Sequence, residues 1–214
     1  MARRVGSDGA RTEAAIRAAA LRLIARYGYE ALSMRRLAGE VGLGAAALYR
    51  YFPNKQAILF ELLKSHMEEL LAAWEAARLP GSANAPARLE AFTRFHIRHH
   101  LPRAEGVFLS YMELRSLEAK YFAAIETMRR RYENDLTAIL ADGVAAGTLT
   151  MDDPRVTARA IIAMLTGITT WYRETGPLVP EDIAEIYWHI VARMTGADGK
   201  AKDQTITAEA LACS

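Results

Sequence analysis

The sequence predicts an all-α protein, and three observations support that prediction. Apolar residues recur at helical spacing through nearly the whole chain, no stretch alternates as a strand, and Ala and Leu are abundant while β-branched residues are few. The 214 residues, 51% of them apolar and 24% charged, are enough to bury a core in one or two domains. We expect a three-helix domain at residues 1–53, a helical domain at 54–196 and a flexible tail at 197–214.

Three helices are expected in the N-terminal domain, over residues 12–27, 33–41 and 44–51. Gly28 follows the first and fits a helix stop, and Ser33 fits the N-cap of the second. Gly42 separates the two short helices, and Ala38 is small where they must approach closely. This arrangement predicts a helix-turn-helix. The side chains expected to fix it by inward packing are Val41, Leu43, Leu48, Tyr51 and Phe52.

Six further helices are expected, over residues 54–78, 86–100, 104–117, 119–146, 153–172 and 181–195. Asn54 can cap the first of them, and Asp153 followed by Pro154 fits the N-cap and first position of the fifth. The loop over residues 80–84 is rich in turn-forming residues. The C-terminal domain is therefore expected to be entirely helical.

The charge is unevenly distributed along the chain. Residues 1–55 contain ten Lys and Arg and four Asp and Glu side chains, a net charge of +6, whereas the other 159 residues carry −4. A basic N-terminal quarter on a mildly acidic body predicts a module that binds a polyanion. The alternative is a solvated helix surface with no such partner.

Several classes of protein are excluded by what the sequence lacks. A single cysteine, Cys213, allows neither an internal disulfide nor a Cys-based zinc site. No apolar run is long enough for a membrane span, and arginines interrupt the N-terminal apolar stretch, so we expect a cytoplasmic protein. No Gly-rich phosphate loop and no Gly-x-Ser-x-Gly motif is present, so we expect neither an enzyme nor a cofactor.

A histidine cluster, His96, His99 and His100, includes an i, i+4 pair, which is a spacing that can bind a metal ion. No carboxylate lies within the run, so no metal site is expected. One histidine, His99, is expected to line a ligand cavity, and the others are expected to face water.

The stretch Ser33–Leu43, followed by Leu48-Tyr49-Arg50-Tyr51-Phe52-Pro53-Asn54-Lys55, closely resembles the DNA-binding domain of the TetR (tetracycline-repressor) family of bacterial regulators. The resemblance is strong over residues 10–60. It implies an all-helical homodimer with three N-terminal helices that bind DNA. The remaining helices would provide ligand binding and dimerisation.

The resemblance also implies DNA contacts: Ser33 and Arg35 would touch backbone and groove, and Tyr49 and Lys55 a phosphate. The first turn of the recognition helix departs from the family, because Ala45, Ala46 and Ala47 offer only methyl contacts to thymine. Base-edge hydrogen bonds would then fall to the arginines. The expected DNA-contacting residues are Ser33, Arg35, Arg36, Ala45, Ala46, Ala47, Tyr49, Arg50 and Lys55.

Aromatic and Met residues from several helices favour a long apolar ligand pocket. The segments over residues 111–117 and 171–173 resemble a subgroup of the family that senses acyl-CoA esters. Arg98, Arg103 and Arg173 are candidate contacts for the phosphates of such a ligand. Arg129–Arg131 are expected on a solvated face with i, i+3 and i, i+4 ion pairs, and the alternative is that they hold an anionic ligand such as a coenzyme A phosphate. The residues expected to contact the ligand are Phe95, His99, Phe108, Tyr111, Met112 and Trp171.

The last two helices carry more apolar residues than one core face requires, which predicts a four-helix dimer interface. The residues expected to be available for it are Ile161, Leu165, Ile168, Ile183, Ile186, Tyr187, Ile190 and Met194. The sequence therefore favours a repressor that leaves a palindromic operator when a small hydrophobic effector binds. The alternatives are an activator of the same family and a helical interaction module that does not bind DNA.

Overall fold

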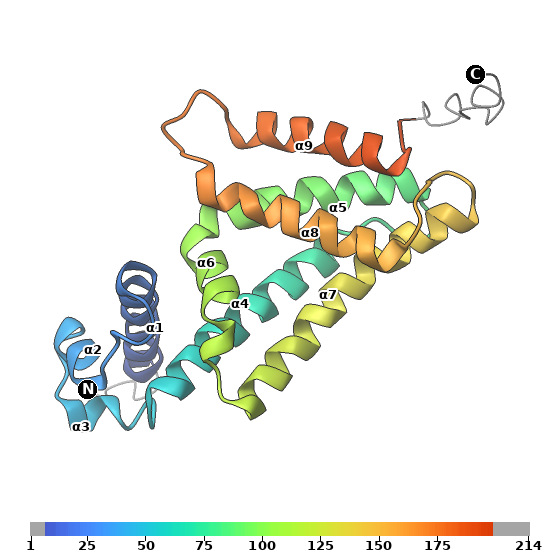
Figure 1. Cartoon of the computed structure of the whole chain (residues 1–214). Coiled ribbons are helices and arrows are strands. Elements are labelled where there is room, and N and C mark those ends of the chain that lie inside the picture. Colours follow the sequence, from blue (N-terminus) through green and yellow to red (C-terminus); the bar gives the residue numbers. More distant parts are fainter. Residues whose placement is uncertain (1–6, 199–214) are drawn as a thin grey trace, which may run out of the picture. The chain divides into compact units, whose positions relative to one another are not determined.

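The computed structural model describes residues 7–198, and within that range all regular structure is helical (Figure 1). The α-helices are α1 Ser7–Tyr27, α2 Met34–Glu40, α3 Ala45–Leu48, α4 Lys55–Ala77, α5 Ala85–His100, α6 Ala104–Met112, α7 Ala119–Ala145, α8 Pro154–Trp171 and α9 Pro180–Thr195. Two 3₁₀ turns, η1 Leu101–Arg103 and η2 Leu114–Ser116, flank α6. The all-α prediction is confirmed. The expected tail falls largely outside the described residues.

The chain forms two compact units. Within the described residues, the first comprises residues 7–73 and Pro102–Arg131, and the second comprises Trp74–Leu101 and residues 132–198. Helices α4 and α7 each contribute to both. The first unit thus contains α1–α3, all but the last turn of α4, α6 and the first half of α7.

The helix ends follow the predicted capping. Ser33 Oγ accepts from the backbone N–H of Arg36 at 3.2 Å, and Asn54 Oδ1 accepts from that of Ala57 at 2.8 Å. Asp153 caps α8 in the same way. Gly28 has φ +81°, a left-handed conformation that ends α1 at little steric cost.

Two expected helices are shorter than predicted. Helix α3 ends at Leu48, because the backbone N–H groups of Arg50 and Tyr51 bond to carbonyls three residues back and wind the chain into turns before Pro53. Helix α6 ends at Met112, where the chain continues as the 3₁₀ turn η2. The prediction of one helix over 104–117 is therefore wrong at its C-terminal end.

The core of the first unit is built from one face of each helix. Its fully buried side chains include Ile16 and Ile24 of α1, Leu37 of α2, Leu48 of α3 and Leu63 of α4. Phe52 is buried as expected, at 5% exposure, while Tyr51 is half-buried. The contacts between α2 and α3, together with the burial of Leu48 and Phe52, therefore fix the orientation of α3 on α2.

The second unit packs α5 against α8 and α9. Phe92 of α5 is fully buried, in edge contact with Trp74 and in tilted contact with Tyr132, both at 5.0 Å between ring centroids. Such aromatic pairs add to the free energy of burial. The unit thus has an aromatic core of its own.

The prediction that two of the three clustered histidines face water is wrong: His96, His99 and His100 are all buried. His96 Nδ1 lies 3.1 Å from Tyr132 Oη and its Nε2 lies 3.1 Å from Thr166 Oγ1. His100 Nδ1 bonds to the carbonyl of His96 at 2.8 Å. Polar partners on facing helices make this burial possible, since a buried imidazole needs hydrogen bonds.

Candidate nucleic-acid interface and effector residues

Helices α2 and α3 form the predicted helix-turn-helix. Gly42 has φ +67° between them, and the N–H of Leu43 donates to the carbonyl of Ala38 at 2.8 Å. Leu37 and Leu48 are fully buried, and Ala38 is 2% exposed. A positive φ favours glycine at this turn, and a small Ala38 lets the two helices approach. The backbone therefore presents one fixed surface of α2 and α3.

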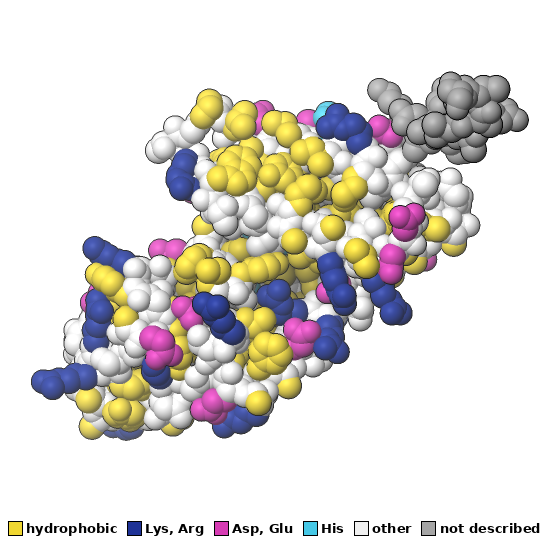
Figure 2. All heavy atoms as spheres, in the orientation of Figure 1, with side chains coloured by type: hydrophobic (Ala, Val, Ile, Leu, Met, Phe, Trp, Pro, Cys, Tyr) yellow, Lys and Arg dark blue, Asp and Glu magenta, His cyan; other side chains and the backbone are white. Residues whose placement is uncertain are grey.

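That surface is basic and open to solvent. The side chains of Arg35, Arg36 and Arg50 are exposed, and Tyr49 is 51% exposed. Figure 2 shows Lys and Arg side chains scattered over this part of the first unit. Within residues 7–198 none of the three arginines forms an ion pair with a carboxylate. The structure thus places the expected arginines and Tyr49 on one small domain. All four side chains are exposed, so the three guanidinium groups can bind an external anion.

The remaining predicted DNA contacts lie on the same two helices or beside them. Ala45 and Ala46 are exposed and Ala47 is half-buried, so the first turn of α3 presents methyl groups. Ser33 is exposed, and its hydroxyl is already used as the cap of α2.

Lys55, at the start of α4, lies near an acid. Its Nζ is 3.3 Å from Glu30 Oε2 and 4.5 Å from the centroid of the Tyr29 ring. A phosphate at the start of α4 would compete with Glu30, which is 87% exposed, for this ammonium group. An exposed ion pair of this kind adds little to the stability of the fold. Exchanging Glu30 for a phosphate would therefore cost little free energy.

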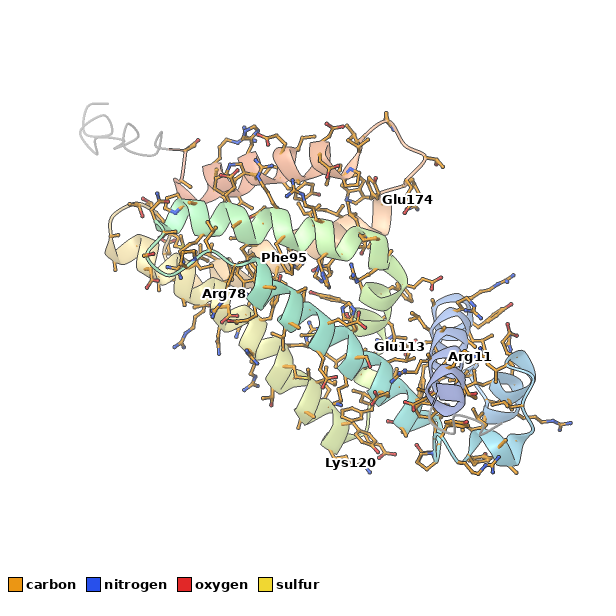
Figure 3. The ribbon with its side chains drawn as sticks, turned by 180° about the vertical axis from the view of Figure 1, so that it is seen from behind. Arg11, Arg78, Phe95, Glu113, Lys120 and Glu174 are labelled. Carbon is orange, nitrogen blue, oxygen red and sulfur yellow. The ribbon has the colours of Figure 1, made fainter. Side chains whose placement is uncertain are left out.

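Sequence reasoning missed the role of Glu113, which follows α6 and lies beside α1 (Figure 3). Its Oε1 accepts the backbone N–H of Tyr29 at 3.1 Å, and its Oε2 accepts the hydroxyl of Ser116 at 2.8 Å. Gln56 of α4 adds two further links: its Nε2 donates to the carbonyl of Ser116 at 2.7 Å, and its Oε1 accepts the N–H of Glu118 at 3.0 Å. The end of α6 is thus bonded to the loop that follows α1.

His66 of the first unit is a buried histidine whose pKa responds to two arginines. His66 of α4 is 9% exposed, and a Cβ on Gly106 of α6 would lie 3.2 Å from its Nδ1. The pKa of His66 is lowered to about 4. Burial is the largest cause, and the positive charges of Arg103 and Arg129 add to it. His66 is therefore neutral at neutral pH.

Arg129 departs from the expected solvated face. Its Nη1 donates to the carbonyl of Ser110 at 3.2 Å, and its guanidinium lies 4.7 Å from the centroid of the Tyr111 ring. Arg130 does form the expected i, i+4 pair, with Glu126 at 3.0 Å. Arg129 thus lies against α6, while Arg130 is exposed.

The six residues expected to contact ligand fall into three places. Phe108, Tyr111 and Met112 lie on α6 with 40–49% of each side chain exposed. In the second unit Phe95 (Figure 3) is half-buried, with its ring 5.3 Å from that of His99. Trp171, at the end of α8, is 48% exposed and stacks 6.5 Å from Tyr187. The structure therefore groups the α6 residues with each other and Phe95 with His99.

One groove of the second unit has a volume of about 390 Å³, and its lining includes Trp74, Arg78, Arg88 and Asp135. It contains none of the six predicted ligand residues. Arg78 pairs with Glu75 at 2.5 Å and Arg88 with Asp142 at 2.8 Å. This polar groove does not match the expected apolar pocket.

Part of the predicted dimer surface is already used inside the chain. Of the eight residues expected at the dimer interface, four are buried within the second unit: Ile161, Leu165, Ile168 and Ile183. Ile186 and Met194 are exposed by 44% and 42%, and Tyr187 and Ile190 are half-buried. Hydrophobic side chains gather over α8 and α9 in Figure 2. The apolar surface left for a partner is therefore smaller than the sequence suggested.

The described helices also bear on a membrane span and on a metal site. No helix in the described part of the chain is long and apolar enough to cross a membrane. Within residues 7–198, no group of three or more His, Cys, Asp and Glu side chains is arranged to hold a metal ion.

Comparisons with known proteins agree with this geometry. Residues 16–62 match the family described as bacterial regulatory proteins, tetR family, and residues 82–195 match the tetracyclin repressor-like C-terminal domain. The fatty acid metabolism regulator protein of Bacillus subtilis is 26% identical over 155 residues, covering 72% of this chain and 79% of that protein. The transcriptional repressor KstR2 of Mycolicibacterium smegmatis is 24% identical over 176 residues, covering 79% and 83%.

Solved structures give the same result. A tetR-family regulatory protein from Rhodococcus RHA1 superposes with a TM-score of 0.80 at 29% identity, covering 86% of this chain and 96% of that one. AibR, solved with isovaleryl coenzyme A and operator DNA, superposes with a TM-score of 0.73 at 27% identity, covering 85% and 97%. The helix-turn-helix, the all-helical second unit and both domain matches show that the chain belongs to the TetR family of bacterial transcriptional regulators.

Proposed function

We propose that this chain is a cytoplasmic repressor that binds a near-palindromic operator as a homodimer and leaves it when a hydrophobic effector binds. It acts by binding alone, without catalysis or a cofactor. The observation that carries the proposal is the exposed basic surface of α2 and α3, where Arg35, Arg36 and Arg50 have no carboxylate partner within residues 7–198. Such charges favour a polyanion.

The proposed DNA contacts divide into two kinds. Tyr49 and Lys55 contact phosphates, which carry no sequence information, whereas Arg35 and Arg50 reach base edges. The exposed methyl groups of Ala45 and Ala46 suit thymine methyls. Sequence recognition by α3 therefore rests on few polar groups.

The dimer is proposed to form through α8 and α9. Val156, Ile186 and Met194 are exposed by 60%, 44% and 42%, and together they supply apolar area on these two helices. Dimerisation would place two α3 helices about one DNA turn apart, roughly 34 Å, to match the operator.

The proposed effector is an acyl-CoA ester. The aromatic and Met side chains of α6 suit an acyl chain, while Arg103 and Arg129 supply positive charge for an anionic group. AibR, solved with isovaleryl coenzyme A, supports this class, and a second relative is named as a regulator of fatty acid metabolism. The effector would release DNA by favouring a conformation with the wrong spacing of the two α3 helices.

The bonds of Glu113 give a route for this coupling. A displacement of α6 would act on Tyr29 through the 3.1 Å bond from its N–H to Glu113, and Tyr29 directly follows the end of α1. An effector that contacts α6 can thereby bias the position of the DNA-binding helices.

DNA binding is tested by titrating purified protein into the DNA upstream of its own gene and into a scrambled duplex. Arg50→Ala should reduce the preference for operator over scrambled DNA, whereas Tyr49→Phe should weaken both equally. A wild-type protein that protects no site at low salt would overturn the proposal. Equal losses on both duplexes for Arg50→Ala would remove its base-reading role.

The effector is tested by a thermal-shift screen of acyl-CoA esters, free fatty acids, steroids and hydrophobic drugs. A ligand of the folded state at 100 times its Kd adds about 2.7 kcal/mol to the free energy of unfolding. Any acyl-CoA that raises Tm should also release the operator. Release by uncharged drugs, with no response to any acyl-CoA, would reject the effector class and leave the DNA-binding proposal intact.

A further inference from the structure

Two arginines converge on one tyrosine at the end of α1. The guanidinium carbon of Arg36, in the first turn of α2, lies 4.1 Å from the centroid of the Tyr27 ring, and that of Arg26 lies 5.1 Å from it. Tyr27 is 45% exposed, and both arginines are exposed. Two positive charges from different helices thus share one aromatic ring at the surface.

Nothing in the described part of the chain neutralises this pair. No carboxylate lies within ion-pair distance of Arg26 or Arg36 among residues 7–198. The C-terminus of α1 favours one cation, Arg26, in its last turn, but a second cation beside it is repelled. An external anion would relieve that repulsion.

We propose that Arg26, Tyr27 and Arg36 form a clamp for a DNA phosphate, a second backbone contact beside the recognition helix. Stacking on the ring restricts each guanidinium and leaves the N–H groups at its edge free to form paired hydrogen bonds with phosphate oxygens. Tyr27 is the positioning residue. The inference rests on the proposed DNA-binding function.

The placement favours a phosphate over a base. In a helix-turn-helix the first helix of the pair crosses the DNA backbone while the second enters the major groove. Arg36 belongs to the first helix, α2, and its guanidinium stacks on a ring of α1 rather than on α3. The structure thereby assigns Arg36 to backbone contact, although the sequence suggested that it reads bases.

The test compares the salt dependence of DNA binding by wild type and by four variants, Arg26→Ala, Arg36→Ala, Tyr27→Ala and Tyr27→Phe. The probes are the duplex upstream of the gene and its scrambled counterpart. Arg131→Ala is the charge-matched control, because Arg131 is exposed on α7 and lies outside the three DNA-binding helices. The Tm of each variant is measured alongside.

Each arginine variant should lower the slope of log K against log salt by about one. Between about 50 and 200 mM salt, wild type should therefore lose about 3.5-fold more affinity than either variant. The preference for operator over scrambled DNA should stay unchanged. Tyr27→Ala should weaken binding to both duplexes, and Tyr27→Phe should bind like wild type because it keeps the ring.

Three outcomes would overturn the clamp. The first is an unchanged salt slope in Arg26→Ala and Arg36→Ala while wild type binds DNA. The second is a loss confined to the operator duplex, which would make Arg36 a base reader. The third is a change of Tm in Tyr27→Ala with unaltered DNA binding, which would make the stack purely structural. Failure of wild type to bind either duplex would instead reject the DNA-binding function itself.

Discussion

Acid should destabilise this protein through His66. The buried imidazole has a pKa of about 4 in the folded chain, lowered first by burial and then by Arg103 and Arg129, against 6.5 for the ordinary side chain. The unfolded chain therefore binds the proton more tightly. The contribution of His66 to stability is complete above about pH 6.5 and is lost as the pH falls toward about 4.

The size of this loss follows from the two pKa values. Lowering the pH from about 7.5 to about 5 should reduce the free energy of unfolding by about 2 kcal/mol through His66 alone. Other histidines add their own dependence, so the measured quantity is the difference between wild type and His66→Leu. Leucine has a similar size and cannot take up a proton. This variant should therefore lose about 2 kcal/mol less unfolding free energy than wild type between the two pH values.

The assay is urea unfolding at both pH values, followed by circular dichroism. His189→Gln serves as a control, because the His189 side chain is 59% exposed and distant in sequence from His66. The absolute stability of His66→Leu is not the readout, since the substitution also alters packing. The reasoning fails if His66→Leu loses as much stability between pH 7.5 and 5 as wild type does.

Three further predictions concern single side chains. Ser33→Ala should lower the free energy of unfolding by about 1 kcal/mol, measured in urea, because it removes the cap of α2; an unchanged midpoint would contradict this. Gly143→Ala should lower the free energy of unfolding, measured in urea, by about 1–3 kcal/mol, because the added Cβ would overlap Leu149 and lie 3.0 Å from the Cβ of Ala85. Gly39→Ala is the matched control, since nothing lies within 4 Å of a Cβ there, and an equal effect of both substitutions would contradict the prediction. Glu113→Ala, which removes the acceptor of the Tyr29 N–H, should leave acyl-CoA binding intact but reduce acyl-CoA-induced release from DNA, seen by fluorescence anisotropy, and full release would reject the proposed route.

The sequence alone determined the local features of this protein. Helical periodicity placed the helices, and glycine, serine, asparagine and aspartate placed their ends, because capping and positive φ depend on neighbouring residues. Ser33 and Asn54 cap the helices they were predicted to cap. The helix-turn-helix was recognisable for the same reason, since its turn and its buried side chains lie within about twenty residues.

Only the tertiary structure decided which distant segments meet. The bond between Glu113 and Tyr29 spans 84 positions, and the partners of His96 lie 36 and 70 positions away. Periodicity marks the buried face of a helix but does not name the helix that covers it. For that reason the burial of three histidines and the convergence of Arg26 and Arg36 on Tyr27 appeared only once the helices were packed.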